Sequence, residues 1–409
     1  IESGIVKRLN KRANKSKAQR TFVPNEYLAN QQYLTNINQL VQFITDHIPD
    51  FKYALFLLTV NLLSKNGLIK YQRTNHKTLD FQSQNIEILR ELEDWANSLS
   101  NSYIETHSDN LLSFPLPVHP DIIGVIYQSL MSEGHKSKAG SYYTPLAVID
   151  GIVKDYSKST FKILDPCCGT GQFLLSFAKS GCAPEMLYGF DTDAIAVRIA
   201  RMNLLCCFSS YSFKPKIFKQ DTLFDSDNLF TQAPSSDFDL IATNPPWGVH
   251  FNDSEKNMLI AAYPGIDSFE SASYFLRKSF ELLKTGGVAS FILPLSILNV
   301  KKHRDIREFL LKNSTILKIV SLERIFQNVF TPVIRLDFKK GKIQNYDVIV
   351  ENANTSYTIQ QQRLENNAHC VFDIDVSHSD VSILDKVFDH PYITLKNQSD
   401  WALGIVTGD

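Results

Sequence analysis

The chain has 409 residues, with 42 Lys and Arg against 43 Asp and Glu and a formal net charge of −1. This length predicts two or three domains and allows a large hydrophobic core. The charge balance excludes an overall basic field, so affinity for nucleic acid would have to come from local clusters of Lys and Arg.

The cysteines and the apolar segments indicate a cytoplasmic protein without a metal site. The six cysteines show no CxxC spacing, which argues against zinc and is consistent with a reducing compartment. The longest apolar stretch, residues 53–63, is too short to span a bilayer. We therefore expect a cytoplasmic protein that does not bind a membrane.

The N-terminal part divides into a basic segment, residues 1–23, and an expected helical domain, residues 24–115. Apolar residues recur at helical spacing over residues 33–48, 52–64 and 84–99. Pro49-Asp50 could begin a nuclease motif, but no convincing ExK sequence follows on a predicted strand, so we do not predict cleavage.

The next region, residues 116–345, begins with an apolar segment that we expect to dock the helical part onto a second domain. It continues with Gly140-Ser141-Tyr142-Tyr143-Thr144-Pro145. A short strand at 161–164 then leads into a glycine-containing loop and an apolar helix. The loop reads Asp165-Pro166-Cys167-Cys168-Gly169-Thr170-Gly171. Glycine at positions 169 and 171 allows close approach of a ligand, as in dinucleotide sites.

Two further predicted strands also end in carboxylates. Residues 187–190 end at Asp191, roughly 20 residues after the glycine loop, where an acid can bind ribose hydroxyls. Residues 216–218 are followed by Gln220 and Asp221. Each aspartate alone could equally be a helix cap. Together they fit the rule that open α/β sheets bind ligands at the carboxyl ends of their strands.

The most informative motif is Asn244-Pro245-Pro246-Trp247, directly after the apolar run 238–243. The Asn244 side-chain oxygen and the Pro245 carbonyl can each accept one N–H from an exocyclic amino group. Consecutive prolines fix the backbone that presents this carbonyl, and Trp247 offers a face for a planar ring. The motif therefore indicates chemistry on a base amino group.

The remaining elements complete an α/β pattern. We expect a helix at 274–283, a capping turn at 284–287, and strands at 288–293, 316–322 and 333–338. A basic cluster that could contact phosphates precedes the last two strands, at Lys301, Lys302, His303, Arg304 and Arg307.

Together, the glycine loop, the Asn-Pro-Pro-Trp motif and the upstream Tyr-Tyr-Thr-Pro segment resemble the amino-group-directed DNA methyltransferases, in particular the adenine-N6 type of restriction–modification systems. The resemblance covers roughly residues 120–340 and the tail. It implies an α/β protein with the Rossmann-like fold of S-adenosylmethionine-dependent methyltransferases, a seven-stranded mixed sheet and an N-terminal helical domain. Asn rather than Ser at 244 favours adenine N6 over cytosine N4 by the same resemblance.

The resemblance also implies roles for individual residues. S-adenosylmethionine would be bound by Tyr143, Thr144, Pro145, Asp165, Cys167, Gly169, Gly171, Asp191, Asp221 and Asn244. The catalytic motif would be Asn244, Pro245, Pro246 and Trp247. The flipped base would stack between Trp247 and an aromatic residue of the loop after the 316–322 strand, with Phe326 preferred and Phe330 as the alternative.

Residues 346–409 change to short strands and loops that end in a Leu-Gly-Ile-Val-Thr-Gly stretch, 403–408. In the family a similar stretch leads into a target recognition domain. We therefore expect double-stranded DNA as substrate, a recognition module that is C-terminal or on a separate subunit, and a restriction subunit as further partner. Two alternatives stay open: a methyltransferase acting on protein glutamine or ribosomal RNA, and a non-catalytic DNA- or subunit-binding platform.

Overall fold

The computed structural model describes residues 31–99, 107–131, 143–224, 237–326 and 331–376, and the single residues 383 and 386. Several predictions made above lie outside these residues. They concern the basic segment 1–23, Gly140 to Tyr142, Phe330 and the stretch 403–408.

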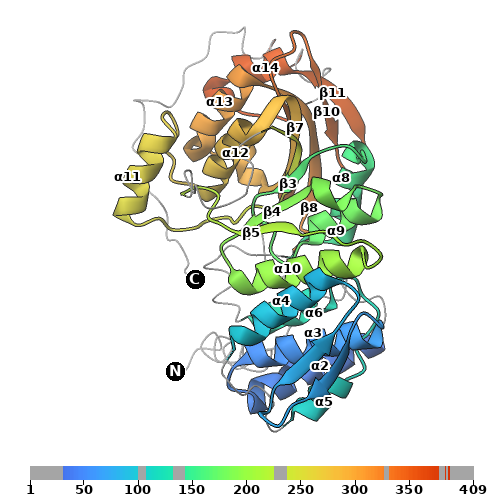
Figure 1. Ribbon diagram of the computed structural model, residues 1–409. Helices are drawn as coiled ribbons and strands as arrows, with labels where there is room; N and C mark the ends of the chain where they lie inside the picture. The colour runs from blue at the N-terminus through green and yellow to red at the C-terminus, as the bar shows by residue number, and fades with distance from the viewer. Residues whose placement is uncertain are drawn as a thin grey trace, which may run out of the picture.

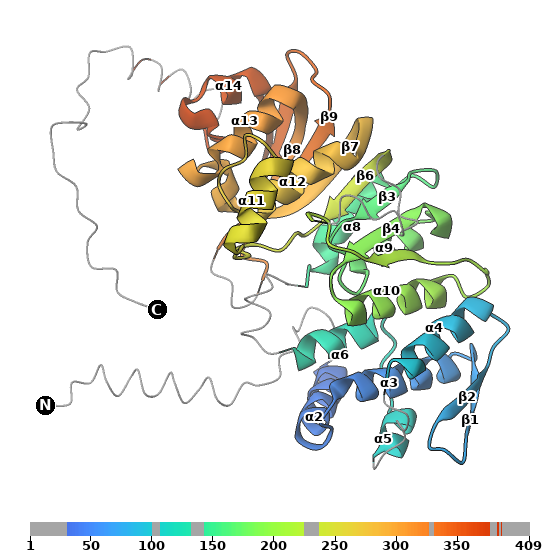
Figure 2. The ribbon, with the colours of Figure 1, turned by 60° about the vertical axis from the view of Figure 1, so that its left-hand side comes forward.

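The N-terminal part of the described chain is mostly helical and lies next to helix α10 (Ala194–Cys207), which packs on a large sheet (Figures 1 and 2). It contains four helices, α2 (Gln31–His47), α3 (Phe51–Lys65), α4 (Ile86–Asn97) and α5 (Ser108–Ser113). The three expected helices are present, with ends shifted by one to two residues. Asp50 is the N-cap of α3 and accepts a hydrogen bond from the Lys52 backbone N–H at 3.0 Å. This local role accounts for its position after Pro49.

A hairpin between α3 and α4 was not predicted. Its strands, β1 (Lys70–Arg73) and β2 (Leu79–Gln82), pair antiparallel with each other, so the region 24–115 is not purely helical. Most of their side chains are polar and exposed, with Leu79 the only buried one. The alternation of apolar and polar residues that normally marks a strand is therefore too weak here to be seen in the sequence.

The second part is built on one mixed sheet with the order β11-β10-β8-β9-β7-β6-β3-β4-β5. The parallel core comprises β3 (Ile163–Asp165), β4 (Leu187–Asp191), β5 (Lys216–Lys219), β6 (Phe238–Thr243) and β7 (Leu283–Pro294). Strand β9 (Val333–Lys340) runs antiparallel between β7 and β8 (Ser314–Glu323). This order confirms the predicted Rossmann-like architecture.

The expected count of seven strands was too low for the described residues. Strand β10 (Asp347–Glu351) pairs parallel with β8, and β11 (Ser356–Gln360) pairs antiparallel with β10, which makes nine. Both lie beyond residue 345, where the prediction placed the end of the domain. The short strands and polar loops of this segment have no sequence feature that distinguishes them from a linker to a further domain.

Helices cover both faces of the sheet. One face carries α8 (Leu146–Tyr156), α9 (Gln172–Lys179) and α10 (Ala194–Cys207), and the other α12 (Ser271–Leu282) and α13 (Arg304–Asn313). The strands are continuous apolar runs in the sequence because both of their faces are buried, as two neighbouring residues of β3 show. Ile163 packs with the first set of helices and Leu164 with the second, and both are fully buried.

The remaining described helices are short or lie at the edges. They are α6 (Ile122–Leu130), which contacts α2, α3 and α10, then α11 (Asp253–Ala262), α14 (Gln361–Asn366) and the 3-10 turns η2 (Pro184–Met186), η3 (Leu295–Leu298), η4 (Lys301–His303) and η5 (Ala368–Cys370). Helix α6 thus links the helical part to the sheet, as its apolar sequence predicted. One hydrophobic cluster continues from α2 and α3 through α6 to α10.

The turn predicted at 284–287 is instead the first part of strand β7, where the pairing with β6 shifts register as in a β-bulge. Gly286 has φ +80°, and a Cβ at Gly287 would come within 2.8 Å of the Phe238 carbonyl oxygen. The two glycines therefore serve the bulge rather than a helix cap.

Candidate functional site

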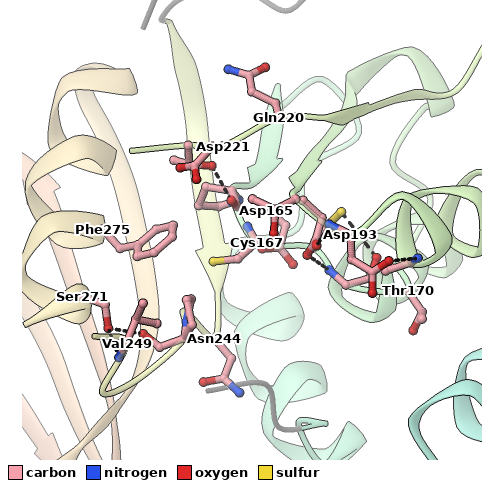
Figure 3. A pocket seen from close by; sticks show the side chains of 18 of the residues that line it. Asp165, Cys167, Thr170, Asp193, Gln220, Asp221, Asn244, Val249, Ser271 and Phe275 are labelled. Carbon is pink, nitrogen blue, oxygen red and sulfur yellow. Dashed lines mark hydrogen bonds between the residues drawn. The ribbon is translucent and has the colours of Figure 1, made fainter. Parts of the chain in front are cut away.

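A pocket of about 470 Å³ lies at the carboxyl ends of β3, β4, β5 and β6. Because these strands are parallel, the residues that follow them meet at one edge of the sheet. Figure 3 shows Asp165 and Cys167 near the centre of this pocket, with Asn244, Ser271 and Phe275 on one side and Asp193 and Thr170 on the other. The sequence-predicted loops are thus brought together in one cavity.

Asp165, the last residue of β3, is 1% exposed and faces this pocket. Its Oδ1 accepts hydrogen bonds from the Thr243 hydroxyl at 2.6 Å and from the Cys167 backbone N–H at 3.2 Å. The Thr243 hydroxyl also lies 3.2 Å from Cys167 Sγ. These contacts fix the end of β3 against the end of β6, one residue before Asn244.

Asp191, the last residue of β4, is tied to the glycine loop. One carboxylate oxygen accepts the Gly169 backbone N–H at 2.8 Å, and the other accepts the Asp193 N–H at 2.9 Å. Asp193 in turn caps α10 and accepts a hydrogen bond from the Tyr127 hydroxyl of α6. The acid expected to bind ribose is therefore held by two backbone donors at the pocket wall.

The two loop glycines have different surroundings. Both have positive φ, +50° at Gly169 and +88° at Gly171. Gly169 lines the pocket, whereas Gly171 does not and instead begins α9. A Cβ at Gly171 would lie 3.1 Å from the Ala200 Cβ of α10, so this position allows two helices to approach closely.

Burial makes the pocket favourable for a positive charge. It raises the pKa of Asp165 to about 7 and that of Asp191 to about 6, with the neighbouring carboxylates adding to the rise and the hydrogen bonds above opposing it. Burial also raises the pKa of the Cys167 thiol well above its ordinary value. The thiol is therefore neutral, and the two carboxyls would be stabilised in their ionised form by a cationic ligand.

Asp221 follows β5 and lines the same pocket with Gln220. Its Oδ1 accepts the backbone N–H groups of Leu223 at 2.9 Å and Phe224 at 3.3 Å, which fixes the turn after the strand. Asp221 therefore both lines the pocket and holds the turn that follows β5.

The Asn-Pro-Pro-Trp motif leaves β6 beside these acids. The Asn244 side-chain NH₂ donates to the Thr144 hydroxyl at 3.1 Å, so the two predicted segments meet directly. The Ser271 hydroxyl donates to the Pro246 carbonyl at 2.6 Å, and this anchors the loop to α12. Tyr143, Thr144, Asn244 and Pro246 line the pocket, whereas Pro145, Pro245 and Trp247 do not.

The two aromatic residues proposed to hold a base are in contact with each other. The rings of Trp247 and Phe326 lie edge to face, with centroids 5.4 Å apart and planes inclined by 73°. Phe326 is 7% exposed. The structure thus brings the two residues together, but their spacing leaves no room for a base between them in this conformation.

Sequence reasoning missed several residues of the site. Thr243 and Ser271 hold the strand end and the motif. One wall is formed by Tyr127 and Gln128 of α6 and by Met131 at its C-cap. The buried Asp121 at the N-cap of α6 contacts the glycine loop. An aspartate directly before an apolar helix was a visible signal for the cap, but its long-range partners have no signature in one sequence.

The basic cluster near residue 301 is only partly at the surface. Arg307 is 1% exposed and donates to the backbone carbonyls of Ile297, Val300, His369 and Cys370. His303 is buried as well, and Lys302 pairs with Glu270. Arg307 and His303 therefore stabilise the fold and cannot contact phosphates as expected.

Among the described residues, no group of three or more His, Cys, Asp or Glu side chains is arranged to hold a metal ion. No helix of that part of the chain is long and apolar enough to cross a bilayer.

Comparison with known proteins places these features in a family. Residues 118–378 match the family model described as N-6 DNA methylase. The type II methyltransferase M.VspI of a Vibrio species is 30% identical over 299 residues, which cover 71% of this chain and 70% of that protein. The chain spans about half the length of other curated relatives that it matches.

Two solved structures share the fold. One is a modification subunit assigned to a type I restriction enzyme from Vibrio vulnificus (TM-score 0.56, 17% identity, 89% of this chain and 90% of that chain). The other is a Listeria monocytogenes protein assigned as a class I S-adenosylmethionine-dependent methyltransferase (TM-score 0.51, 17% identity, 81% of this chain and 94% of that chain). The fold, the pocket and the family match agree, and the chain belongs to the N-6 DNA methylase family.

Proposed function

We propose that the chain transfers a methyl group from S-adenosylmethionine to N6 of an adenine flipped out of double-stranded DNA, as the modification enzyme of a restriction–modification system. The observation that carries this proposal is the position of Asn244. It leaves β6 one residue after Thr243, whose hydroxyl is bonded to the pocket carboxyl Asp165. An acceptor for an amino group therefore adjoins a pocket suited to a cation.

The pocket fits S-adenosylmethionine by its charge. The ligand carries positive sulfonium and ammonium groups, and the buried Asp165 and Asp191 have raised pKa values that a nearby cation would lower. When bound, S-adenosylmethionine supplies an electrophilic methyl group. Asp191 would hold its ribose and Asp221 its adenine, while Asp165, Cys167, Gly169, Tyr143 and Thr144 would surround the methionine part.

The chain's own residues supply position and electrostatics. The Asn244 side-chain oxygen and the Pro245 carbonyl would accept the two N–H groups of the target amine, which directs its lone pair at the methyl group. The bonds from Asn244 to Thr144 and from Ser271 to the Pro246 carbonyl hold this loop in place. No covalent enzyme nucleophile is needed.

The target adenine would have to leave the duplex, because N6 takes part in base pairing. Unstacking costs a few kcal/mol, offset in part by stacking on aromatic side chains. Trp247 and Phe326 are the candidates, and their edge-to-face contact would have to open or present one outer face. Phe330 remains the alternative to Phe326.

DNA recognition would need more than the described residues. We propose a target recognition module that is C-terminal or on a separate subunit, with a restriction subunit as a further partner. The Vibrio vulnificus protein of similar fold is itself named a modification subunit, which supports this arrangement.

The deciding experiment measures transfer of a radioactive methyl group from S-adenosylmethionine to unmethylated genomic duplex DNA, with and without the recognition module. Nucleoside analysis should then detect N6-methyladenine, which Asn244→Ala removes. Methylation of release factor or ribosomal RNA, but not DNA, would favour the first alternative. Failure of the intact assembly to bind S-adenosylmethionine would favour the non-catalytic platform.

A further inference from the structure

Asp121 is a buried carboxylate with four donors from four separate segments. It is 1% exposed and caps α6 by accepting the Gly124 backbone N–H at 3.0 Å. It also accepts hydrogen bonds from three side chains, the Thr170 hydroxyl at 2.6 Å, the Asn203 amide at 2.7 Å and the Tyr143 hydroxyl at 3.0 Å. A helix cap alone needs only the first of these contacts.

Two of the side-chain donors belong to the wall of the cofactor pocket. Thr170 lies in the glycine loop next to Gly169, whose N–H binds Asp191. Tyr143 precedes Thr144, whose hydroxyl accepts from Asn244. Asp121 itself does not line the pocket.

Asn203 of α10 strengthens the connection. Its NH₂ group donates to Asp121 and also to the Thr170 carbonyl at 3.0 Å, and its side chain is buried. The glycine loop is therefore held at Thr170 through both the side-chain hydroxyl and the backbone carbonyl. A buried carboxylate with several donors resists movement, because any displaced donor would leave an unsatisfied polar group.

We propose that Asp121 is a positioning residue for methyl transfer, which sets the glycine loop and the Tyr143–Thr144 segment relative to each other and thereby orients Asn244. The proposal rests on the proposed function, because both segments are assigned to S-adenosylmethionine. It also gives helix α6, at the junction with the helical part, a direct role in assembling the pocket.

The first test compares the dissociation constant of S-adenosylmethionine for wild type and for Asp121→Asn. It is measured by calorimetry at a temperature below the melting temperatures of both proteins. The introduced amide has one acceptor oxygen in place of two, so at least one of the groups that donate to Asp121 would face an NH₂ group. We expect binding about tenfold weaker, the loss of roughly one charged hydrogen bond. We also expect kcat to fall with saturating cofactor, since Asn244 loses its orientation.

Asp337→Asn is the matched control. Asp337 is equally buried and also accepts from side-chain hydroxyls, Ser290 at 2.6 Å and Tyr156 at 2.8 Å, but it does not line the pocket. It should lower the melting temperature at least as much and leave the dissociation constant within about twofold. Equal weakening by both variants would overturn the proposal, since Asp121 would then act only through general stability.

Gly124→Ala gives an independent test without substituting a charged residue. A Cβ at Gly124 would overlap the Asp121 carboxylate and displace it. The substitution should weaken cofactor binding in the wild-type background but not in Asp121→Ala, where no carboxylate remains to be displaced. Equal effects in both backgrounds would overturn the proposal.

Tyr143→Phe decides the question if Asp121→Asn does not fold. It removes only the hydroxyl that reaches Asp121, so unchanged cofactor affinity and kcat would contradict the positioning role. A folded wild-type assembly that binds no S-adenosylmethionine would instead refute the proposed function itself. The two failures are therefore distinguishable.

Discussion

The two sides of the site differ in how completely their groups are already held. On the cofactor side, Asp165 and Asp191 each accept two hydrogen bonds from the ends and loops of neighbouring strands. On the base side, Trp247 and Phe326 come from segments far apart in the chain and pack edge to face on each other. The groups proposed to bind the cofactor are therefore preorganised, whereas the aromatic pair proposed to bind a base would have to rearrange to receive it.

This difference follows from how each side is built. The carboxyl ends of parallel strands converge, so the sheet itself places the acids. An aromatic pair without a base between its rings minimises exposed apolar surface by closing. Substitutions on the cofactor side should therefore change binding of the cofactor alone, while those on the base side should change steps that involve DNA.

The largest effect is expected from Asn244→Ala. It removes an acceptor for the target amine, and loss of one such group typically lowers kcat by about 10²- to 10³-fold. Methyl transfer to DNA should fall by this factor, while the cofactor dissociation constant measured by calorimetry changes little. Asn352→Ala, in the turn between β10 and β11 and outside the pocket, is the matched control and should leave kcat unchanged. Loss of cofactor binding in Asn244→Ala would show that the two sides are not separable.

Asp191→Ala should act on the other side of the comparison. It removes the carboxylate proposed to bind ribose and leaves the Gly169 and Asp193 N–H groups without their acceptor. Binding of S-adenosylmethionine should weaken about 10- to 100-fold in calorimetry. Asp253→Ala serves as control, because this side chain is almost fully exposed and outside the pocket. Unaltered affinity in Asp191→Ala would remove Asp191 from the cofactor site.

The strand ends that meet in the pocket could be predicted from the sequence pattern, whereas the partner of Trp247 could not. Asp165, Asp191 and Asn244 each follow an apolar run, and the parallel topology brings such strand ends together. Phe326 could be chosen only through the family resemblance, because an aromatic residue in a loop carries no local signal of its partner. Its contact with Trp247 joins residues separated by roughly eighty positions.

Other features escaped prediction for related physical reasons. The β1–β2 hairpin has few buried side chains, so it lacks the alternating pattern. The run at 284–287 has the composition of a turn, yet its glycines form a bulge because Gly287 packs against the Phe238 carbonyl. Arg307 lies in a basic cluster typical of a surface, yet it is buried and four backbone carbonyls compensate its burial.

Phe326→Ala should sharpen the base side of the comparison. Stacking of a base on an aromatic ring contributes about 1–3 kcal/mol. We therefore expect the variant to destabilise the flipped state of the base by an amount near the middle of this range. The measurement is the fluorescence of 2-aminopurine placed at the target adenine, whose rise on flipping should change in the variant. Phe309→Ala, a half-buried aromatic that packs on Phe280 away from the pocket, is the control. An unchanged signal with unchanged transfer would shift the role to Phe330.

The smallest expected effect is the pH dependence of cofactor binding. The pKa values of Asp165 and Asp191 in the free protein are about 7 and about 6, and a bound cation would lower both. The complex then holds fewer protons, so affinity should rise with pH across this window, by at most about tenfold per pH unit for each proton released, and level off above it. The folding stability of the free protein depends on pH with the opposite sign. The stability contributed by these two carboxyls is present below their unfolded pKa of about 4 and is lost as pH rises through about 6 to 7. Calorimetry in two buffers of different ionisation enthalpy measures the released protons directly. If protons are taken up on binding, or if no protons are released between pH 6 and 7, these carboxyls do not face the ligand's positive charge. The proposed cofactor side would then be organised by its hydrogen bonds alone.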